Sequence, residues 1–119
     1  MKEFEFNSVK FYVGQSAKEN WELLDKANQT NIWFHLDSFK SPYVIMCCSI
    51  DILEELQNTS ENIPSVDHFL YYGANLCKEY SKYKYLKDIK VMYTDIKNVS
   101  KGTKLGEAII KGKRKIIKL

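Results

Sequence analysis

Hydrophobic and polar residues alternate most regularly between Asn31 and Asp37, and the rest of the chain can be arranged around this stretch. Successive side chains of a strand point to opposite faces, so its aliphatic and aromatic positions share one face that suits a core. These positions are Ile32, Phe34 and Leu36. The opposite face carries Trp33, His35 and the Asp37 carboxylate. Two interpretations of this face stay open: Trp33 covers a secondary cluster while His35 satisfies a backbone carbonyl, or the face lines a binding surface.

The same kind of pattern predicts the other elements. Period-two alternation and apolar runs predict four more strand segments, at residues 4–6, 9–13, 43–48 and 90–96. Helical spacing predicts three helices, at residues 17–26, 50–56 and 65–80. Ser16 with Glu19 forms a capping box at the start of the first helix.

The C-terminal segment is predicted as a loop over residues 99–106 followed by a hairpin. In this hairpin, residues 107–110 pair with residues 114–119 around Lys111-Gly112-Lys113. The fold class that results is α+β, with a mainly antiparallel, curved sheet and two or three helices in a single domain.

Composition agrees with one domain that buries a sizeable core. The chain has 119 residues, of which 45% are hydrophobic and 13% aromatic, and this excludes a disordered chain. No apolar run approaches the roughly 18 residues that cross a membrane, and the N-terminus lacks the apolar region of a signal peptide. We therefore expect a cytoplasmic protein that is monomeric and does not act at a membrane.

The residues that most often carry catalysis or bind metals are few. Cys47 and Cys48 are adjacent and poorly placed to form a disulfide with each other, so all three cysteines are expected to be reduced thiols. Together with the two histidines they lack the paired spacing of a zinc site. His35 and Asp37 share a strand face, but no nucleophile motif or glycine-rich phosphate loop accompanies them. The sequence therefore predicts no enzyme, no cofactor and no metal.

Charge is strongly segregated along the chain. Residues 1–96 hold 10 Lys against 14 Asp or Glu, whereas residues 97–119 hold eight basic residues against Glu107 alone. A basic end of this kind is typical of proteins that bind a polyanion. The basic residues expected to contact phosphate are Lys97, Lys101, Lys104, Lys111, Lys113, Arg114 and Lys115.

Aromatic residues alternate with lysines in the segment Lys82-Tyr83-Lys84-Tyr85. Its tyrosines are candidates for stacking on unpaired bases, and its lysines for contacting the adjacent phosphates. The chain has 17 Lys and one Arg. Lysine acts as a point charge toward phosphate, so we expect little base-specific recognition.

Several segments together resemble the NFACT-R domain family. They are Tyr12-Val13-Gly14-Gln15-Ser16-Ala17-Lys18-Glu19-Asn20, Ile32-Trp33-Phe34-His35-Leu36 and the strand from Tyr43 to Met46. Val91-x-Tyr93-Thr94, followed by a Lys-rich loop, a glycine and a basic last strand, also resembles the family pattern. Gln15 stands where the family has Arg, Asn31 stands near the family's Asp, and Ser41-Pro42-Tyr43 replaces a Gly-Ser-His turn.

The resemblance implies that residues 1–119 form an RNA-binding domain. In the family this domain occurs in large ribosome quality-control factors and in small eukaryotic single-module proteins that usually carry a coiled-coil tail. The chain is more similar to the second type, without the tail. The resemblance therefore implies binding to the ribosome, with occupancy of an rRNA or tRNA site in dormancy or quality control. The alternative is a DNA-binding or scaffold protein that acts away from ribosomes.

Overall fold

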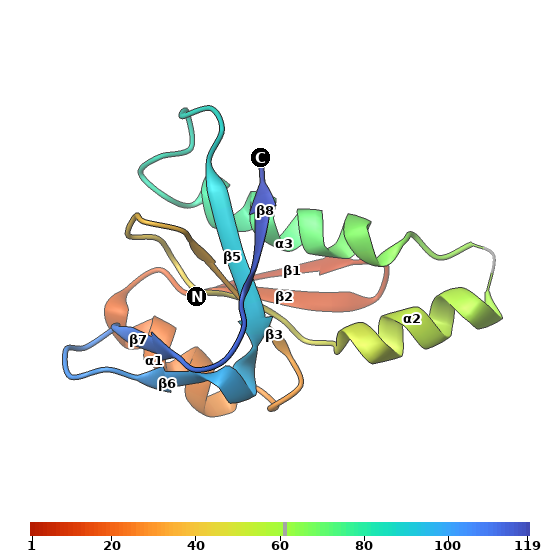
Figure 1. Ribbon diagram of the computed structural model, residues 1–119, viewed down its shortest axis with the longest axis horizontal. Helices are drawn as coiled ribbons and strands as arrows, with labels where there is room; N and C mark the ends of the chain where they lie inside the picture. Colours follow the sequence, from red (N-terminus) through yellow and green to blue (C-terminus); the bar gives the residue numbers. More distant parts are fainter. Residues whose placement is uncertain (61) are drawn as a thin grey trace.

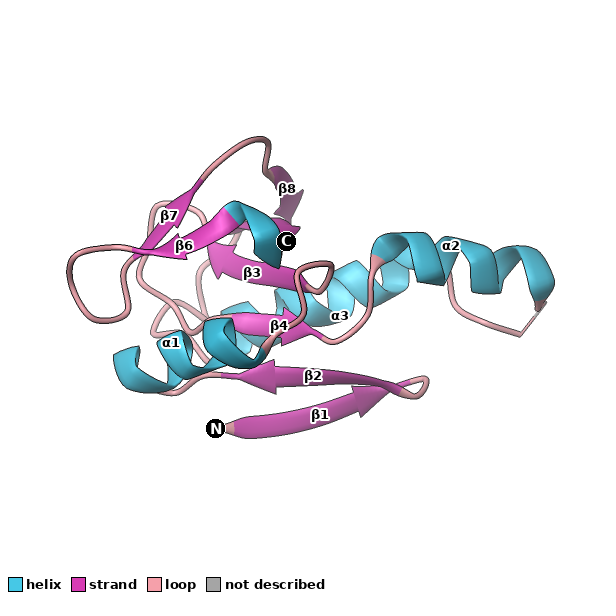
Figure 2. Ribbon diagram, turned by 90° about the horizontal axis from the view of Figure 1, so that it is seen from below, coloured by secondary structure: helices cyan, strands magenta, loops and turns pink. Residues whose placement is uncertain are grey.

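The computed structural model describes residues 1–60 and 62–119 as a six-stranded antiparallel sheet, a two-stranded sheet and three α-helices. The strands of the larger sheet are β1 (Lys2–Phe6), β2 (Val9–Val13), β3 (Ile32–Leu36), β4 (Val44–Met46), β5 (Lys90–Asp95) and β8 (Lys115–Lys118). Their order is β1-β2-β4-β3-β5-β8, so β1 and β8 are the two edges and the sheet is not closed (Figure 2). β3 therefore lies in the interior of the sheet, between β4 and β5.

The remaining elements flank this sheet. They are α1 (Ala17–Lys26), α2 (Ile50–Thr59), α3 (Val66–Glu79), the 3-10 turn η1 (Ile96–Asn98), β6 (Val99–Lys101) and β7 (Ala108–Ile110). β6 and β7 pair with each other to form the smaller sheet. In the described part of the chain, none of the helices has the length and apolar character that a membrane span requires.

The main core lies between α3 and one face of the sheet. Phe34 on β3 and Val91 on β5 are fully buried there, beneath Phe69, Ala74 and Cys77 of the helix. Gly73 allows the closest approach, because a Cβ at this position would lie 2.5 Å from Cζ of Phe34. Burial of several large side chains, at about 1.5–3 kcal/mol each, makes this face the main source of stability.

A second cluster covers the opposite face of the sheet. Trp33, Tyr43 and Ile45 are buried there, together with Leu23 of α1 and Ile96 of the 3-10 turn. The partly buried side chains of β6 and β7 also pack against this cluster. The sheet is thus covered on both faces, by α3 on one side and by α1 with the small hairpin on the other.

α2 extends beyond the rest of the molecule (Figures 1 and 2). Leu53 is its fully buried residue, while Ile52 and Leu56 remain exposed. The helix carries Asp51, Glu54 and Glu55 and no basic residue. α2 is therefore an acidic projection from a domain whose basic residues lie elsewhere.

Most of the predicted elements are confirmed, and the α+β class with its mainly antiparallel sheet is correct. The first two strands turn at Asn7 and Ser8, which both have positive φ. The Ser16 side chain accepts a hydrogen bond from the Glu19 N–H, as the predicted cap requires. The Glu19 carboxylate accepts from the N–H of Gln15, one residue before the position that a capping box uses.

The predicted C-terminal hairpin is wrong. Residues 108–110 pair with β6, which forms inside the predicted loop, and β8 pairs with β5. The reason lies in burial, because Ala108 and Ile110 pack in the cluster around Trp33 whereas Ile117 and Leu119 pack in the core under α3. A hairpin of residues 107–110 with residues 114–119 could not bury its two strands on opposite faces of the sheet.

Candidate nucleic-acid interface

A groove of about 1120 Å³ opens beside β3, on the side that carries Trp33 and His35. Four separate segments form its walls, at residues 14–17, 38–42, 80–83 and 104–108. The side chains of Trp33, His35 and Met92 line it from the sheet. Met92 is the cross-strand partner of His35, so these side chains share one face.

His35 is half-buried in this groove and is held in a fixed orientation. Its ring stacks on Trp33 with a centroid distance of 5.4 Å and an interplanar angle of 9°. The Tyr43 ring meets both rings edge-on, and His35 Nδ1 lies 2.8 Å from the carbonyl oxygen of Leu36. Burial lowers the pKa of His35, only partly offset by the hydrogen bond to Leu36. The imidazole is therefore neutral at pH 7, with Nδ1–H donating to Leu36 and Nε2 left as an acceptor.

Trp33 is completely buried, which confirms the packing interpretation of its strand face. Within residues 1–60 and 62–119, its Nε1–H is a buried side-chain donor that has no hydrogen-bond partner. An unsatisfied buried donor costs about 1–3 kcal/mol and is uncommon in native proteins. Trp33 is among the residues around the groove, and its side chain supports the ring of His35.

Lysines dominate the charge around the groove. Lys40, Lys82 and Lys104 line it and are exposed, against one carboxylate, that of Glu107. Glu107 Oε1 accepts a hydrogen bond of 2.9 Å from the N–H of Thr103. Three cations and one engaged carboxylate give the groove a net positive character that favours an anionic ligand.

Two aromatic rings form part of the wall next to these lysines. Phe39 and Tyr83 pack with a centroid distance of 4.5 Å, and both line the groove. Phe39 precedes Lys40 and Tyr83 follows Lys82. The groove therefore combines apolar ring surface with flanking positive charge, the combination that single-stranded nucleic acids require.

The wall that contains Lys104 is anchored to α1 and to Tyr43. The Tyr43 hydroxyl donates to the carbonyl oxygen of Gly106 at 2.7 Å, and Trp21 Nε1–H donates to that of Glu107 at 3.0 Å. Burial, and to a smaller extent the charge of Glu107, raises the pKa of Tyr43 to about 12, so its hydroxyl remains a donor. Lys101 pairs with Asp25 at 2.8 Å. These contacts fix the β6–β7 connection over the sheet.

Gly14 and Asn20, which carry part of the family resemblance, have a structural role at the groove. The Asn20 side chain accepts a hydrogen bond of 3.1 Å from the N–H of Tyr43, and Gly14 N–H donates to the Tyr43 carbonyl at 3.0 Å. A Cβ at position 14 would collide with Asn20 Oδ1. The pair therefore holds the start of β4 next to the end of β2.

The groove collects five of the predicted site residues, namely Trp33, His35, Lys82, Tyr83 and Lys104. Three more lie in the exposed connection between β7 and β8, namely Lys111, Lys113 and Arg114. This connection reaches the face of the sheet that carries Trp33. Thr94 is the cross-strand partner of Trp33 and therefore lies on that face, and its Oγ1 donates to the carbonyl oxygen of Lys113 at 3.0 Å. The groove and this connection together form one basic face.

The other predicted residues lie outside the groove. Lys97 Nζ lies 3.8 Å from Asp95 Oδ2, and Lys101 forms the ion pair with Asp25 described above. Lys115 is opposite Tyr93 on the α3 side of the sheet. Tyr85 is 86% exposed, with Lys84 Nζ 5.1 Å from its ring centroid.

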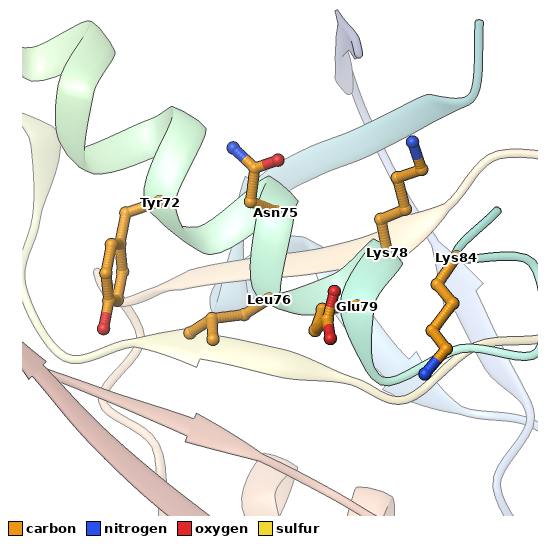
Figure 3. A pocket seen from close by; sticks show the side chains of 6 residues that line it. All are labelled: Tyr72, Asn75, Leu76, Lys78, Glu79 and Lys84. Atoms are coloured by element: carbon orange, nitrogen blue, oxygen red, sulfur yellow. The ribbon is translucent and has the colours of Figure 1, made fainter. Parts of the chain in front are cut away.

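Lys84 also lines a second, smaller pocket beside α3. Figure 3 shows this pocket, with Tyr72 at one end and Lys78, Glu79 and Lys84 toward the other. Its charges are mixed and its volume is about 320 Å³. The larger groove is therefore the stronger candidate site.

Sequence reasoning did not identify Phe39 and Lys40 as site residues. Both precede Pro42 in a connection predicted only as a turn, and they join the groove through contacts with residues about 40 positions away. Their one local signal is an aromatic residue beside a lysine, the same pairing that marked Lys82 and Tyr83.

Comparison with known proteins gives the family. The family model of the NFACT protein RNA binding domain matches residues 4–118. The chain belongs to this family. The NFACT-R domain described here is also similar in structure to the C-terminal part of the fibronectin/fibrinogen-binding protein from Streptococcus suis, with a TM-score of 0.73. The two are 22% identical, over 93% of this chain and 40% of the other, so this likeness shows the fold alone. No curated protein is similar enough in sequence to count as a match.

Five positions depart from the pattern that the sequence resembles. Gln15, Ser41 and Pro42 line the groove, whereas Asn31 and Tyr43 do not.

Proposed function

We propose that this domain binds RNA on the ribosome and acts by occupying an rRNA or tRNA site, in ribosome dormancy or in quality control. The observation that carries the proposal is the basic face, in which the groove lysines and the connection at residues 111–114 lie on the same side of the sheet. Membership of the RNA-binding family supports RNA as the polyanion. In this proposal the domain acts in the cytoplasm, as a monomer, without a catalytic step or cofactor.

Binding through lysines derives its free energy mainly from the release of counterions that are condensed on the RNA. The logarithm of the association constant falls linearly with the logarithm of the salt concentration. Each phosphate contact makes the slope of this line steeper by about 0.7–0.9. Lysine contacts to phosphate carry little sequence information. The proposed mode of action therefore depends on the shape and charge of the ribosomal site rather than on a base sequence.

The experiment is co-sedimentation of the protein with purified ribosomes over a range of salt concentrations. We expect the wild-type protein to bind at low salt. When Lys111, Lys113 and Arg114 are all changed to Glu, we expect the salt dependence of binding to weaken by about one unit of slope per lost contact. The matched control changes Lys2, Lys78 and Lys87 to Glu, which alters the net charge equally at positions outside the groove and outside the connection at residues 111–114. Absence of the wild-type protein from the ribosome pellet at low salt would disprove the proposal.

A competition assay separates this function from the alternative of a DNA-binding or scaffold protein. The protein is bound to a labelled rRNA fragment and challenged with unlabelled rRNA or with duplex DNA of equal phosphate concentration. We expect rRNA to be the better competitor. If duplex DNA competes better, the ribosomal role is wrong and the DNA-binding role replaces it.

A further inference from the structure

The groove is larger than simple phosphate binding by lysines requires. Lysines on an open surface suffice for backbone contacts, whereas here four chain segments border an open groove of about 1120 Å³. Ligand pockets of about 300–1000 Å³ hold molecules of the size of a nucleotide or larger. The groove can therefore admit a base that has left its helix, together with its sugar and phosphate.

His35 offers a ring on which such a base can stack. Its imidazole continues the stack that begins with the buried Trp33, and it remains half-exposed to the groove. Because Trp33, Tyr43 and the Leu36 carbonyl already fix its orientation, no side-chain freedom is lost when a base binds. Phe39 and Tyr83 supply further ring surface in the wall.

We propose that the groove receives one unpaired nucleotide of the bound RNA, whose base stacks on His35. This inference rests on the RNA binding proposed above. The lysines at positions 40, 82 and 104 contact the phosphates on either side of that nucleotide. The domain thus distinguishes looped or bulged RNA from continuous duplex, through base stacking and without reading a long sequence.

The first test follows the two indole N–H signals in ¹H–¹⁵N spectra of the wild-type protein, because the chain has two tryptophans. A single-stranded oligoribonucleotide is expected to move the His35 ring signals, and with them the indole signal of Trp33, whose ring stacks on His35. The Trp21 signal is the internal control, since its N–H already donates to Glu107. A blunt RNA duplex of the same length is expected to leave the Trp33 signal in place.

The second test measures affinity for the same single strand and duplex by fluorescence anisotropy. His35→Ala is expected to lower the ratio of single-strand to duplex affinity by about 5- to 100-fold, the range expected for one lost base stack. His35→Phe retains a flat ring and is expected to restore most of this ratio. Tyr71→Ala removes an exposed aromatic residue outside the groove and is the matched control.

The outcomes distinguish this inference from the proposed function. If both RNAs bind but the Trp33 and His35 signals stay unchanged, or if the duplex moves them equally, the groove inference is wrong and RNA binding stands. If neither RNA binds at low salt, the proposed function fails as well. If free mononucleotides bind as tightly as the oligonucleotide, the groove is a mononucleotide site, which overturns recognition of an RNA strand.

Discussion

At the scale of single residues, the burial of His35 predicts a pH dependence of stability. Its pKa in the folded protein is lowered from the ordinary value of 6.5, so the unfolded chain binds the proton more readily. This contribution to the free energy of unfolding is complete above pH 6.5 and is lost as the pH falls below that value. Urea unfolding between pH 7.5 and 5 is expected to show a smaller loss for His35→Gln than for the wild type. His68→Gln changes the other, exposed histidine and serves as the control.

Prediction from the sequence was most successful where one side chain decides the local structure. The alternation around Phe34 gave the correct core face, and Ser16 gave the correct helix start. The hydrogen bond of His35 to a backbone carbonyl was one of two open interpretations, and the acceptor is Leu36. The contacts of His35 with Tyr43 and its place opposite Met92 could not be predicted, because they depend on how the strands pair.

Gly73 provides a prediction about packing. Gly73→Ala gains about 1 kcal/mol of helix propensity but places a methyl group against the fully buried ring of Phe34. Overpacking of this kind costs about 1–3 kcal/mol, so we expect a net loss in the free energy of unfolding. Urea denaturation measures it, with Asn75→Ala on the exposed side of α3 as the control. A variant about 1 kcal/mol more stable than the wild type would show that Phe34 can shift without cost.

At the scale of elements, the strand segments were largely predictable, but the pairing of the last three was not. β3 and β4 are joined by a short connection and pair antiparallel. β7 and β8 are also joined by a short turn containing Gly112, a pattern typical of a hairpin, yet they pair with β6 and β5. The two-sided burial that decides this pairing depends on α1 and α3 and therefore cannot be inferred from the local sequence.

Two glycines test how the β6–β7 connection is held. Gly106 and Gly112 have φ values of +85° and +82°, so a side chain causes similar backbone strain at both. A Cβ at Gly106 would also lie 2.6 Å from Cβ of Ala17, whereas at Gly112 the nearest atom is 3.8 Å away. We expect Gly106→Ala to reduce stability by at least about 1 kcal/mol more than Gly112→Ala. Amide exchange of Gly102, which donates to Glu107, is expected to accelerate in the first variant only.

At the scale of the whole molecule, only some of the basic residues that cluster at the C-terminal end of the sequence lie on one common face. The groove lysines and the connection at residues 111–114 share a face, but Lys97 and Lys101 have acidic partners. The groove itself was not predictable, since its walls come from four distant segments. A search for basic residues in the sequence finds the polyanion-binding class but not the site.

The acidic helix α2 permits a whole-molecule control for RNA binding. Asp51, Glu54 and Glu55 lie on a helix that projects away from the basic face. At 0.15 M salt, where the Debye length is about 8 Å, neutralising them to Asn, Gln and Gln is expected to change RNA affinity by less than about twofold. A filter-binding titration measures this. A large increase in affinity would place the bound RNA next to α2, contrary to the proposed face.

The acidic projection of α2 also gives the molecule a dipole along its longest axis, which extends 44 Å. The β6–β7 connection with Lys104 lies toward the other end of this axis (Figure 1). At low ionic strength, where screening is weak, such a dipole experiences a torque near a phosphate surface before the two molecules touch, and it turns the protein with its lysines foremost. Rotational alignment during approach would then raise the fraction of collisions that bring the groove against RNA.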